Sequence, residues 1–185
     1  FEGARRAGKQ WVEFKEQNEG KTLIKQQELD DANKIINNAM SHPVLTEMMQ
    51  NKEAVEIRLD WEHKGVAFKG FADLLTTFNG RKCVVDIKTT FDAGRRFERD
   101  LYYNDYKMQL AMYQDQYDKD TDAYIVAIET ATPFNVQIYK LDDSLLFKGW
   151  MDYDHYTDKF LEWDGKPQGY SNSIVEVKTE VEEIL

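Results

Sequence analysis

Two aspartates and a lysine stand out because they fall on strand-like segments joined by a tight turn. Asn79-Gly80 separates two extended runs and is typical of a two-residue type I′ hairpin turn. A loop of that length places Asp73 directly opposite Asp86, with Lys88 two residues further along on the face of Asp86. Carboxylates that face each other in a covered sheet repel and lose hydration, so this pair needs a compensating cation.

The compensating cation is either a metal ion or the lysine. A hard divalent ion such as Mg²⁺ takes one or two carboxylates and keeps waters for a substrate phosphate, which favours the metal. The alternative is a partly buried ion triad of Lys88 with Asp73 and Asp86. An acid-x-Lys tripeptide occurs seven times in the chain, so only the hairpin context distinguishes Asp86-Ile87-Lys88.

A third acid depends on the preceding turn. If Lys64-Gly65 is also a two-residue loop, Glu56 faces Asp73 and three acids lie in a row. A three-residue loop would turn Glu56 to the opposite face.

The elements that position these residues follow from hydrophobic periodicity and turn signals. The sequence predicts helices over roughly 4–18, from about Asp30 to Pro43, from Pro43 through Met49, over 101–117 and over 142–162. It predicts strands over 55–61, 66–77, 82–88, 124–129 and 134–140, a polar loop over 91–99 and an irregular acidic end over the last twenty residues. This order predicts an α/β (α+β) domain with a central mixed five-stranded sheet that begins with a three-stranded antiparallel meander and is flanked by helices.

Composition narrows the class of protein. The 185 residues are 42% hydrophobic, with no linker and no run of about 18 apolar residues, so we expect a single domain over 1–185 with no membrane span. One cysteine, Cys83, excludes a disulfide framework and an iron–sulfur cluster, and indicates a reducing, cytoplasmic location. Because the chain begins at Phe1 rather than Met, we expect that an upstream segment is missing.

The net charge of −10 argues against a protein that coats nucleic acid non-specifically. Residues 64–107 nevertheless hold nine Lys or Arg against six Asp or Glu. The charge pattern therefore allows a localised basic channel in an acidic exterior.

Three motifs in order carry a resemblance to a known family. Gly70-Phe71-Ala72-Asp73, Asp86-Ile87-Lys88 and Gln109-Leu110-Ala111-Met112-Tyr113 resemble the Gly-x-x-Asp, Asp/Glu-x-Lys and Gln-x-x-x-Tyr motifs of the RecB-like branch of the PD-(D/E)XK nuclease superfamily. The sequence looks most like RecE-type phage and prophage exonucleases, with the motif-bearing core at about 54–140. The branch commonly has a metal-associated histidine on an upstream helix, for which His42 beside Pro43 is a poor candidate.

The resemblance implies a restriction-endonuclease-like core and a role for each matched residue. Asp73 and Asp86 would bind Mg²⁺, which Mn²⁺ can replace, together with the backbone carbonyl of Ile87; Glu56 would hold a second ion or a water. Lys88 would orient or deprotonate the attacking water. Gln109 and Tyr113 would steady the lysine and the substrate backbone, although a tyrosine stripe at helical spacing is by default core or interface.

The resemblance also implies DNA as the partner. Arg95, Arg96 and Arg99 could hold DNA phosphate, or could simply form a solvated loop; Thr89, Thr90 and Lys69 complete the expected DNA-binding set. The implied activity is a Mg²⁺-dependent exonuclease acting on linear duplex with a 5′-phosphate end in phage-type recombination. The resemblance also implies a ring-shaped homo-oligomer and a single-strand annealing partner. The alternatives are an endonuclease or single-strand nuclease of the same superfamily, or a non-catalytic interaction module.

Overall fold

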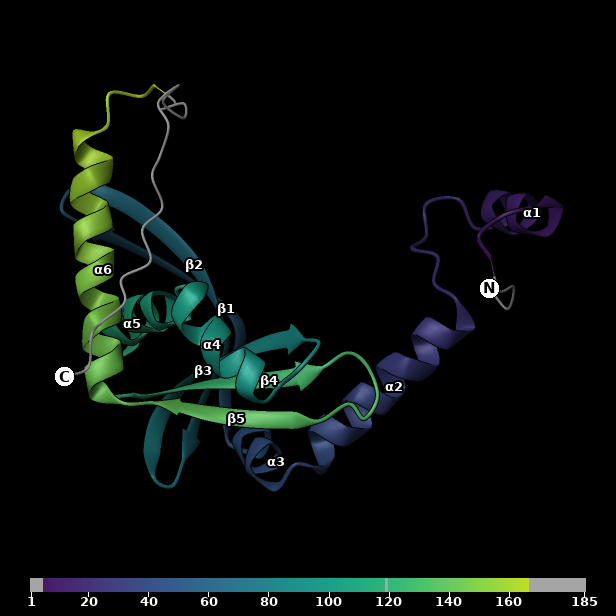
Figure 1. The fold of residues 1–185 in the computed structure, drawn as a ribbon, viewed down its shortest axis with the longest axis horizontal. Helices are drawn as coiled ribbons and strands as arrows, with labels where there is room; N and C mark the ends of the chain where they lie inside the picture. The colour runs from purple at the N-terminus through teal and green to yellow at the C-terminus, as the bar shows by residue number, and fades with distance from the viewer. Residues whose placement is uncertain (1–4, 119, 167–185) are drawn as a thin grey trace, which may run out of the picture.

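The computed structural model describes residues 5–118 and 120–166. A five-stranded mixed sheet in the order β1-β2-β3-β4-β5 forms its centre (Figure 1). β1, β2 and β3 form an antiparallel meander, β3 and β4 are parallel, and β4 and β5 are antiparallel. The predicted fold class, the meander and the mixed five-stranded sheet are therefore confirmed. The strands are β1 (Lys52–His63), β2 (Val66–Phe78), β3 (Arg81–Thr90), β4 (Asp122–Glu129) and β5 (Val136–Leu141).

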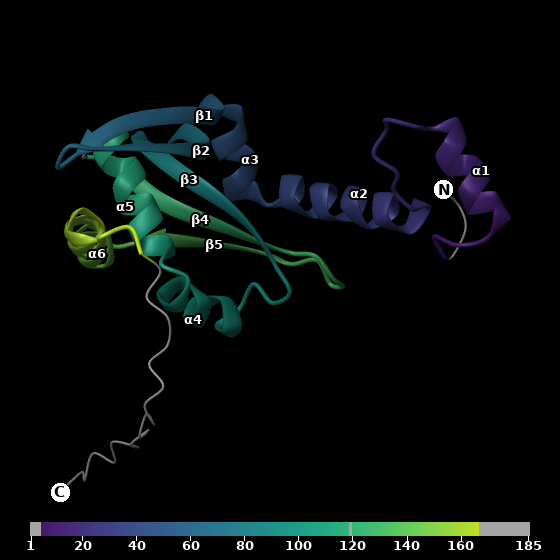
Figure 2. The same cartoon turned by 90° about the horizontal axis from the view of Figure 1, so that it is seen from above.

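Helices cover the two faces of the sheet unequally (Figure 2). α4 (Arg95–Tyr103), α5 (Tyr106–Tyr117) and α6 (Asp143–Glu162) pack on one face, here called the α5 face. α3 (Pro43–Gln50) and the end of α2 (Gln26–Ser41) pack on the other, the α3 face. Val84 and Val85, adjacent on β3, belong to the α5-face and α3-face cores respectively, as the alternation of side chains along a strand requires.

The N-terminal helices extend away from the sheet. α1 (Lys9–Gln17) and most of α2 project to one side of the molecule (Figures 1 and 2), and α1 buries no residue. The segment between them is held by Arg6, which donates to the carbonyl of Leu23 and to Glu28. Pro43 opens α3 at its first turn, as predicted.

The segment after β3 differs from the prediction. The expected loop over 91–99 extends only over 91–94, and α4 begins at Arg95, because Phe97 and Leu101 lie one turn apart and both face the core. The expected continuous helix over 101–117 is broken between α4 and α5 by Asp105, whose φ of 53° is left-handed. The predicted irregular end lies, apart from Lys166, outside the described residues. Among the residues the structure describes, no helix is long and apolar enough to cross a membrane.

Candidate active site

Both hairpin turns are two-residue loops: Asn79-Gly80 as predicted, and Lys64-Gly65 as the first of the two alternatives considered for it. β2 pairs with β3 from Phe78 opposite Arg81 up to Leu74 opposite Val85. The backbone pairing ends there, one step before Asp73 and Asp86. The expectation that these aspartates form a directly opposed pair within the ladder is therefore wrong, because β2 and β3 stop pairing at the step where the acids begin.

β1 and β2 share an irregularity at the same step. On each strand, two residues three positions apart contact the α5-face core: Ala54 and Ile57 on β1, and Ala72 and Leu75 on β2. Each strand thus contains one extra residue, Glu56 on β1 and Asp73 on β2, and these two are unpaired although the pairs on either side keep one register. Glu56 has a φ of 47°, a left-handed conformation that is uncommon for a glutamate.

The side chain of Asp73 makes the last contact between β2 and β3, beyond the final backbone pair. Its Oδ2 accepts a hydrogen bond of 2.6 Å from the backbone N–H of Ile87 on β3. The carboxylate therefore takes the place of the backbone carbonyl that a continuing strand would have offered. This contact brings the acid of β2 to the residue between Asp86 and Lys88.

Asp86 is the buried acid of the site, with 2% of its surface exposed. Its Oδ1 accepts a hydrogen bond of 3.0 Å from Nε2 of Gln109. Its buried Oδ2 lies 2.7 Å from Nζ of Lys88 but has no aligned hydrogen-bond donor. Burial raises the pKa of Asp86, and the charge of Asp73 raises it further, while Lys88 and Gln109 oppose the shift.

Gln109 connects the acid to the lysine. Its Oε1 accepts a hydrogen bond of 3.1 Å from Nζ of Lys88, while its Nε2 donates to Asp86 and, at 3.2 Å, to the hydroxyl of Tyr113. The ammonium of Lys88 also lies 4.9 Å from the ring centre of Tyr106. The structure thus brings four predicted catalytic residues, Asp86, Lys88, Gln109 and Tyr113, into one hydrogen-bonded network, here called the Gln109 network.

The donor set suits a hard cation that needs few protein ligands. Among the described residues, no three His, Cys, Asp or Glu side chains are arranged to hold a metal ion, so the expected row of three acids is not a formed cluster. Asp73 and Asp86 still offer two carboxylates, and the buried Oδ2 of Asp86, which has the Lys88 ammonium nearby but no aligned hydrogen-bond donor, could also accept a metal ion. Mg²⁺ needs only one or two carboxylates because it retains waters. Binding of the cation by Asp73, Asp86 and the carbonyl of Ile87, with Glu56 nearby, stays a prediction.

Glu56 and Asp73 meet at a hollow on the α3 face. Its volume is about 380 Å³, and its lining residues are Met49, Val55, Glu56, Asp73, Leu74 and Ile87. Apart from the two acids, the lining is apolar. The site therefore has the Gln109 network on one face of the sheet and this hollow on the other, with Asp73 between them.

The residues expected to bind DNA lie in three different places: on α4, at the end of β3 and in the outer part of the β1–β2 hairpin. Arg95, Arg96 and Arg99 are exposed on α4 and form no ion pair with any described residue. Thr89 is exposed at the end of β3, whereas the hydroxyl of Thr90 interacts with the backbone of Asp92 in the turn before α4. Lys69 is exposed opposite Asp60 in the outer part of the β1–β2 hairpin, and it is not part of the Gln109 network.

Two residues that sequence reasoning missed fix the turn that opens α4. Glu129, 8% exposed at the end of β4, accepts from the N–H of Ala93 at 3.1 Å and of Asn135 at 2.9 Å. The hydroxyl of Tyr139 donates to the carbonyl of Ala93 at 2.5 Å. The available signal was a glutamate that ends the otherwise apolar run of β4.

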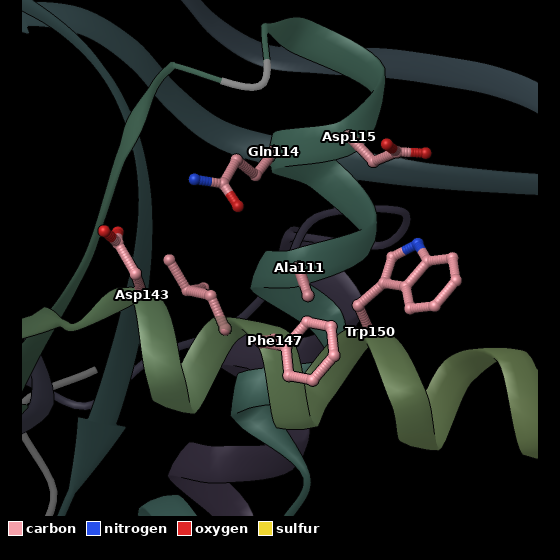
Figure 3. A pocket seen from close by; sticks show the side chains of 7 residues that line it. Ala111, Gln114, Asp115, Asp143, Phe147 and Trp150 are labelled. Atoms are coloured by element: carbon pink, nitrogen blue, oxygen red, sulfur yellow. The ribbon is translucent and has the colours of Figure 1, made fainter.

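A second hollow lies between α5 and α6, away from the predicted residues. It is lined by Ala111, Gln114, Asp115, Asp143, Leu146, Phe147 and Trp150 and has a volume of about 310 Å³ (Figure 3). None of the residues predicted to act in catalysis lines it.

Comparisons with known proteins concern the family and the fold of the chain. Residues 6–166 match a family profile described as "PDDEXK-like domain of unknown function (DUF3799)". The crystal structure of a protein named "Putative exonuclease" from Eubacterium rectale superposes with a TM-score of 0.62 at 16% identity, covering 82% of this chain and 60% of that chain. The crystal structure of SSO0001 has 21% identity, a TM-score of 0.35 and coverage of 56% of this chain and 50% of that chain.

The chain thus spans 60% of the length of the Eubacterium rectale protein, and at 16% identity the likeness concerns the fold. A comparison with curated proteins gave no match. Because the family profile covers nearly all of the described residues, including the acids, lysine and glutamine of the site, the chain belongs to this PDDEXK-like family and, with it, to the PD-(D/E)XK nuclease superfamily.

Proposed function

We propose that the protein is a Mg²⁺-dependent DNA exonuclease that hydrolyses phosphodiester bonds at the ends of linear duplex DNA in phage-type recombination or DNA processing. The observation that carries this proposal is the buried carboxylate of Asp86, which Gln109 connects to Lys88 beside the unpaired step at Asp73. A buried acid with a raised pKa beside a second acid and a lysine is an arrangement that active sites commonly use.

Each residue of the site then has a defined task. Asp73 and Asp86, with the carbonyl of Ile87, would hold the cation. When bound, Mg²⁺ polarises the scissile phosphate and acidifies water. The cation also favours the charged form of Asp86, which burial alone disfavours.

Lys88 supplies positive charge where negative charge develops. Its ammonium has three donors, of which the hydrogen bond to Gln109 uses one, so that a donor is available for a water or a phosphate oxygen. Gln109 keeps the ammonium in place because its own amide is fixed by Asp86 and Tyr113. Removal of Lys88 should therefore lower the rate of hydrolysis more than the affinity for DNA.

The arginines of α4 are proposed to hold the DNA backbone. Arg95, Arg96 and Arg99 follow directly after the end of β3 and the turn fixed by Glu129. Their guanidinium groups suit phosphate, including a terminal 5′-phosphate. A ring-shaped homo-oligomer and an annealing partner stay predictions, which light scattering and co-purification would test.

The test compares linear 5′-phosphorylated duplex with closed circular DNA of the same sequence. With Mg²⁺, the wild-type protein should degrade the linear form and spare the circle, while Asp86→Ala and Lys88→Ala should lose activity. Lys159→Ala, at an exposed position on α6, is the control and should behave as wild type.

The possible results separate the alternatives. Equal cutting of the circle would indicate an endonuclease, and hydrolysis of single strands alone would indicate a single-strand nuclease. Undiminished activity of both site variants would overturn the site assignment. A wild-type protein that binds DNA without hydrolysing it would favour the non-catalytic module.

A further inference from the structure

The hollow on the α3 face is open and mainly apolar. Val55 is 52% exposed and Ile87 is 36% exposed, although both are apolar and both lie beside carboxylates. α3 reaches the hollow only through Met49, and Phe71 on β2 is also exposed. At about 380 Å³, the hollow falls within the range of about 300–1,000 Å³ that is typical of small-ligand sites.

The hollow reaches the proposed active site at Asp73. Asp73 lines it and also accepts the N–H of Ile87, the residue next to Asp86. A DNA strand whose phosphate lies at Asp73 and Asp86 therefore has one of its nucleosides within reach of Val55 and Ile87. The apolar walls can contact the faces of a base, and the carboxylate of Glu56 can accept from an exocyclic amino group.

The backbone at Glu56 supports a role in binding. Its left-handed φ of 47° is costly for a glutamate inside a strand, and such conformations concentrate at functional positions. The extra residue in each strand places Glu56 and Asp73 together at the edge of the hollow.

We propose that this hollow is a subsite for one unstacked nucleobase, that of a nucleotide next to the phosphate to be hydrolysed. The inference rests on the proposed function and adds to it a substrate preference. The base must leave the duplex stack to enter, so frayed ends and single-stranded DNA are the favoured substrates.

The test measures the contribution of the base to binding. Single-stranded oligonucleotides carry an abasic nucleotide at the first, second or third position from the 5′ end and a fluorescent label at the other end. Binding is followed by anisotropy with Mg²⁺, using full-length protein that carries Lys88→Ala to prevent hydrolysis. At one of the three positions, loss of the base should weaken binding about tenfold.

A matched pair of variants locates the effect. Val55→Asp makes one wall of the hollow polar, and Val12→Asp introduces the same change on α1, where Val12 is 51% exposed. The ratio of the two dissociation constants, abasic over intact DNA, should fall to about one in Val55→Asp and stay near ten in Val12→Asp. Because each ratio is taken within one protein, the effect of the added charge on DNA binding cancels.

The outcomes decide between the two proposals. A ratio near one at every position, or equal ratios in Val55→Asp and Val12→Asp, would overturn the subsite. Hydrolysis by wild-type protein without base discrimination leaves the nuclease and removes the subsite. Base discrimination in a protein that hydrolyses no DNA leaves the subsite and removes the nuclease.

Discussion

Gly70 on β2 lies directly beneath the ring of Tyr113 on α5. A Cβ at position 70 would stand 2.5 Å from Cε1 and 2.9 Å from the hydroxyl oxygen of Tyr113. That hydroxyl accepts from Gln109, which in turn bonds both Asp86 and Lys88. The absence of a side chain on one strand therefore sets the position of the Gln109 network on the facing helix.

Gly70→Ala should displace the tyrosine ring and, through it, Gln109. We expect hydrolysis to fall at least about tenfold, because misplacement of catalytic groups by about 1 Å costs up to about 100-fold. Overpacking should lower the free energy of unfolding by about 1–3 kcal/mol. In the double variant Gly70→Ala/Tyr113→Ala the clash is gone, so the two changes should be strongly non-additive in both assays; simple additivity would contradict the contact.

Gln109→Glu tests the bridge between acid and lysine. A glutamate can still accept from Lys88, but it cannot donate to Asp86 or Tyr113 and it adds a negative charge beside a buried carboxylate. We expect about a 100-fold loss of activity. Tyr113→Phe, which removes only the hydroxyl, should cost less than about tenfold. A Gln109→Glu enzyme as active as wild type would show that the amide has no role.

Metal binding should compete with protons at Asp86. Since the pKa of Asp86 is raised, the metal-free fold binds this proton more tightly than the unfolded chain does. The group therefore stabilises the fold fully below the unfolded pKa, and this contribution is lost as pH rises through the folded pKa. Calorimetric Mg²⁺ titrations should show the affinity falling as pH drops through that raised pKa, because binding must then displace the proton of Asp86 and release it to the buffer; Asp86→Asn should remove this dependence.

The salt dependence of DNA binding should show how many of the α4 arginines contact DNA phosphate. Each phosphate contact contributes about 0.9 to the slope of log K against log salt concentration for duplex DNA. Replacement of Arg95, Arg96 and Arg99 by Gln should lower the slope by up to that amount per residue. Arg58→Gln is the control, because Arg58 is paired with Asp60 on the outer hairpin. An unchanged slope in the triple variant would show that the three arginines of α4 do not contact DNA phosphate.

Glu129 should act on DNA binding through the turn that opens α4. Glu129→Gln leaves one acceptor where two backbone N–H groups now bond, so the turn loosens and the free energy of unfolding falls by about 1–3 kcal/mol. The KM for DNA should rise several-fold with little change in kcat. A fall in kcat at constant KM would instead place the effect at the Gln109 network.

Local signals in the sequence were strong enough to predict the sheet. Asn79-Gly80 and Lys64-Gly65 have left-handed backbones in two-residue turns, as turn chemistry requires, and the registers followed directly. Gln109 and Tyr113 were placed together because residues four apart share a helix face.

The unpredicted features depend on contacts between distant segments. No periodicity indicates an extra residue in two strands at once, because the register on either side is the same as in a regular hairpin. The start of α4 was missed because its polar residues dominate the segment, and only packing of Phe97 and Leu101 on the sheet selects a helix. The role of Glu129 depends on two turns that are close in space only after β4 and β5 have paired.

The matched extra residues in β1 and β2 make the site separable from the scaffold. Deletion of Asp73 alone would shift every residue on one side of the hairpin to the wrong face. Deletion of Glu56 and Asp73 together would restore uninterrupted alternation on both strands, with Val55 opposite Leu74 and Ile57 opposite Ala72 as they are now. Loss of both codons could thus convert the interrupted hairpin into a regular one, whereas loss of either codon alone could not.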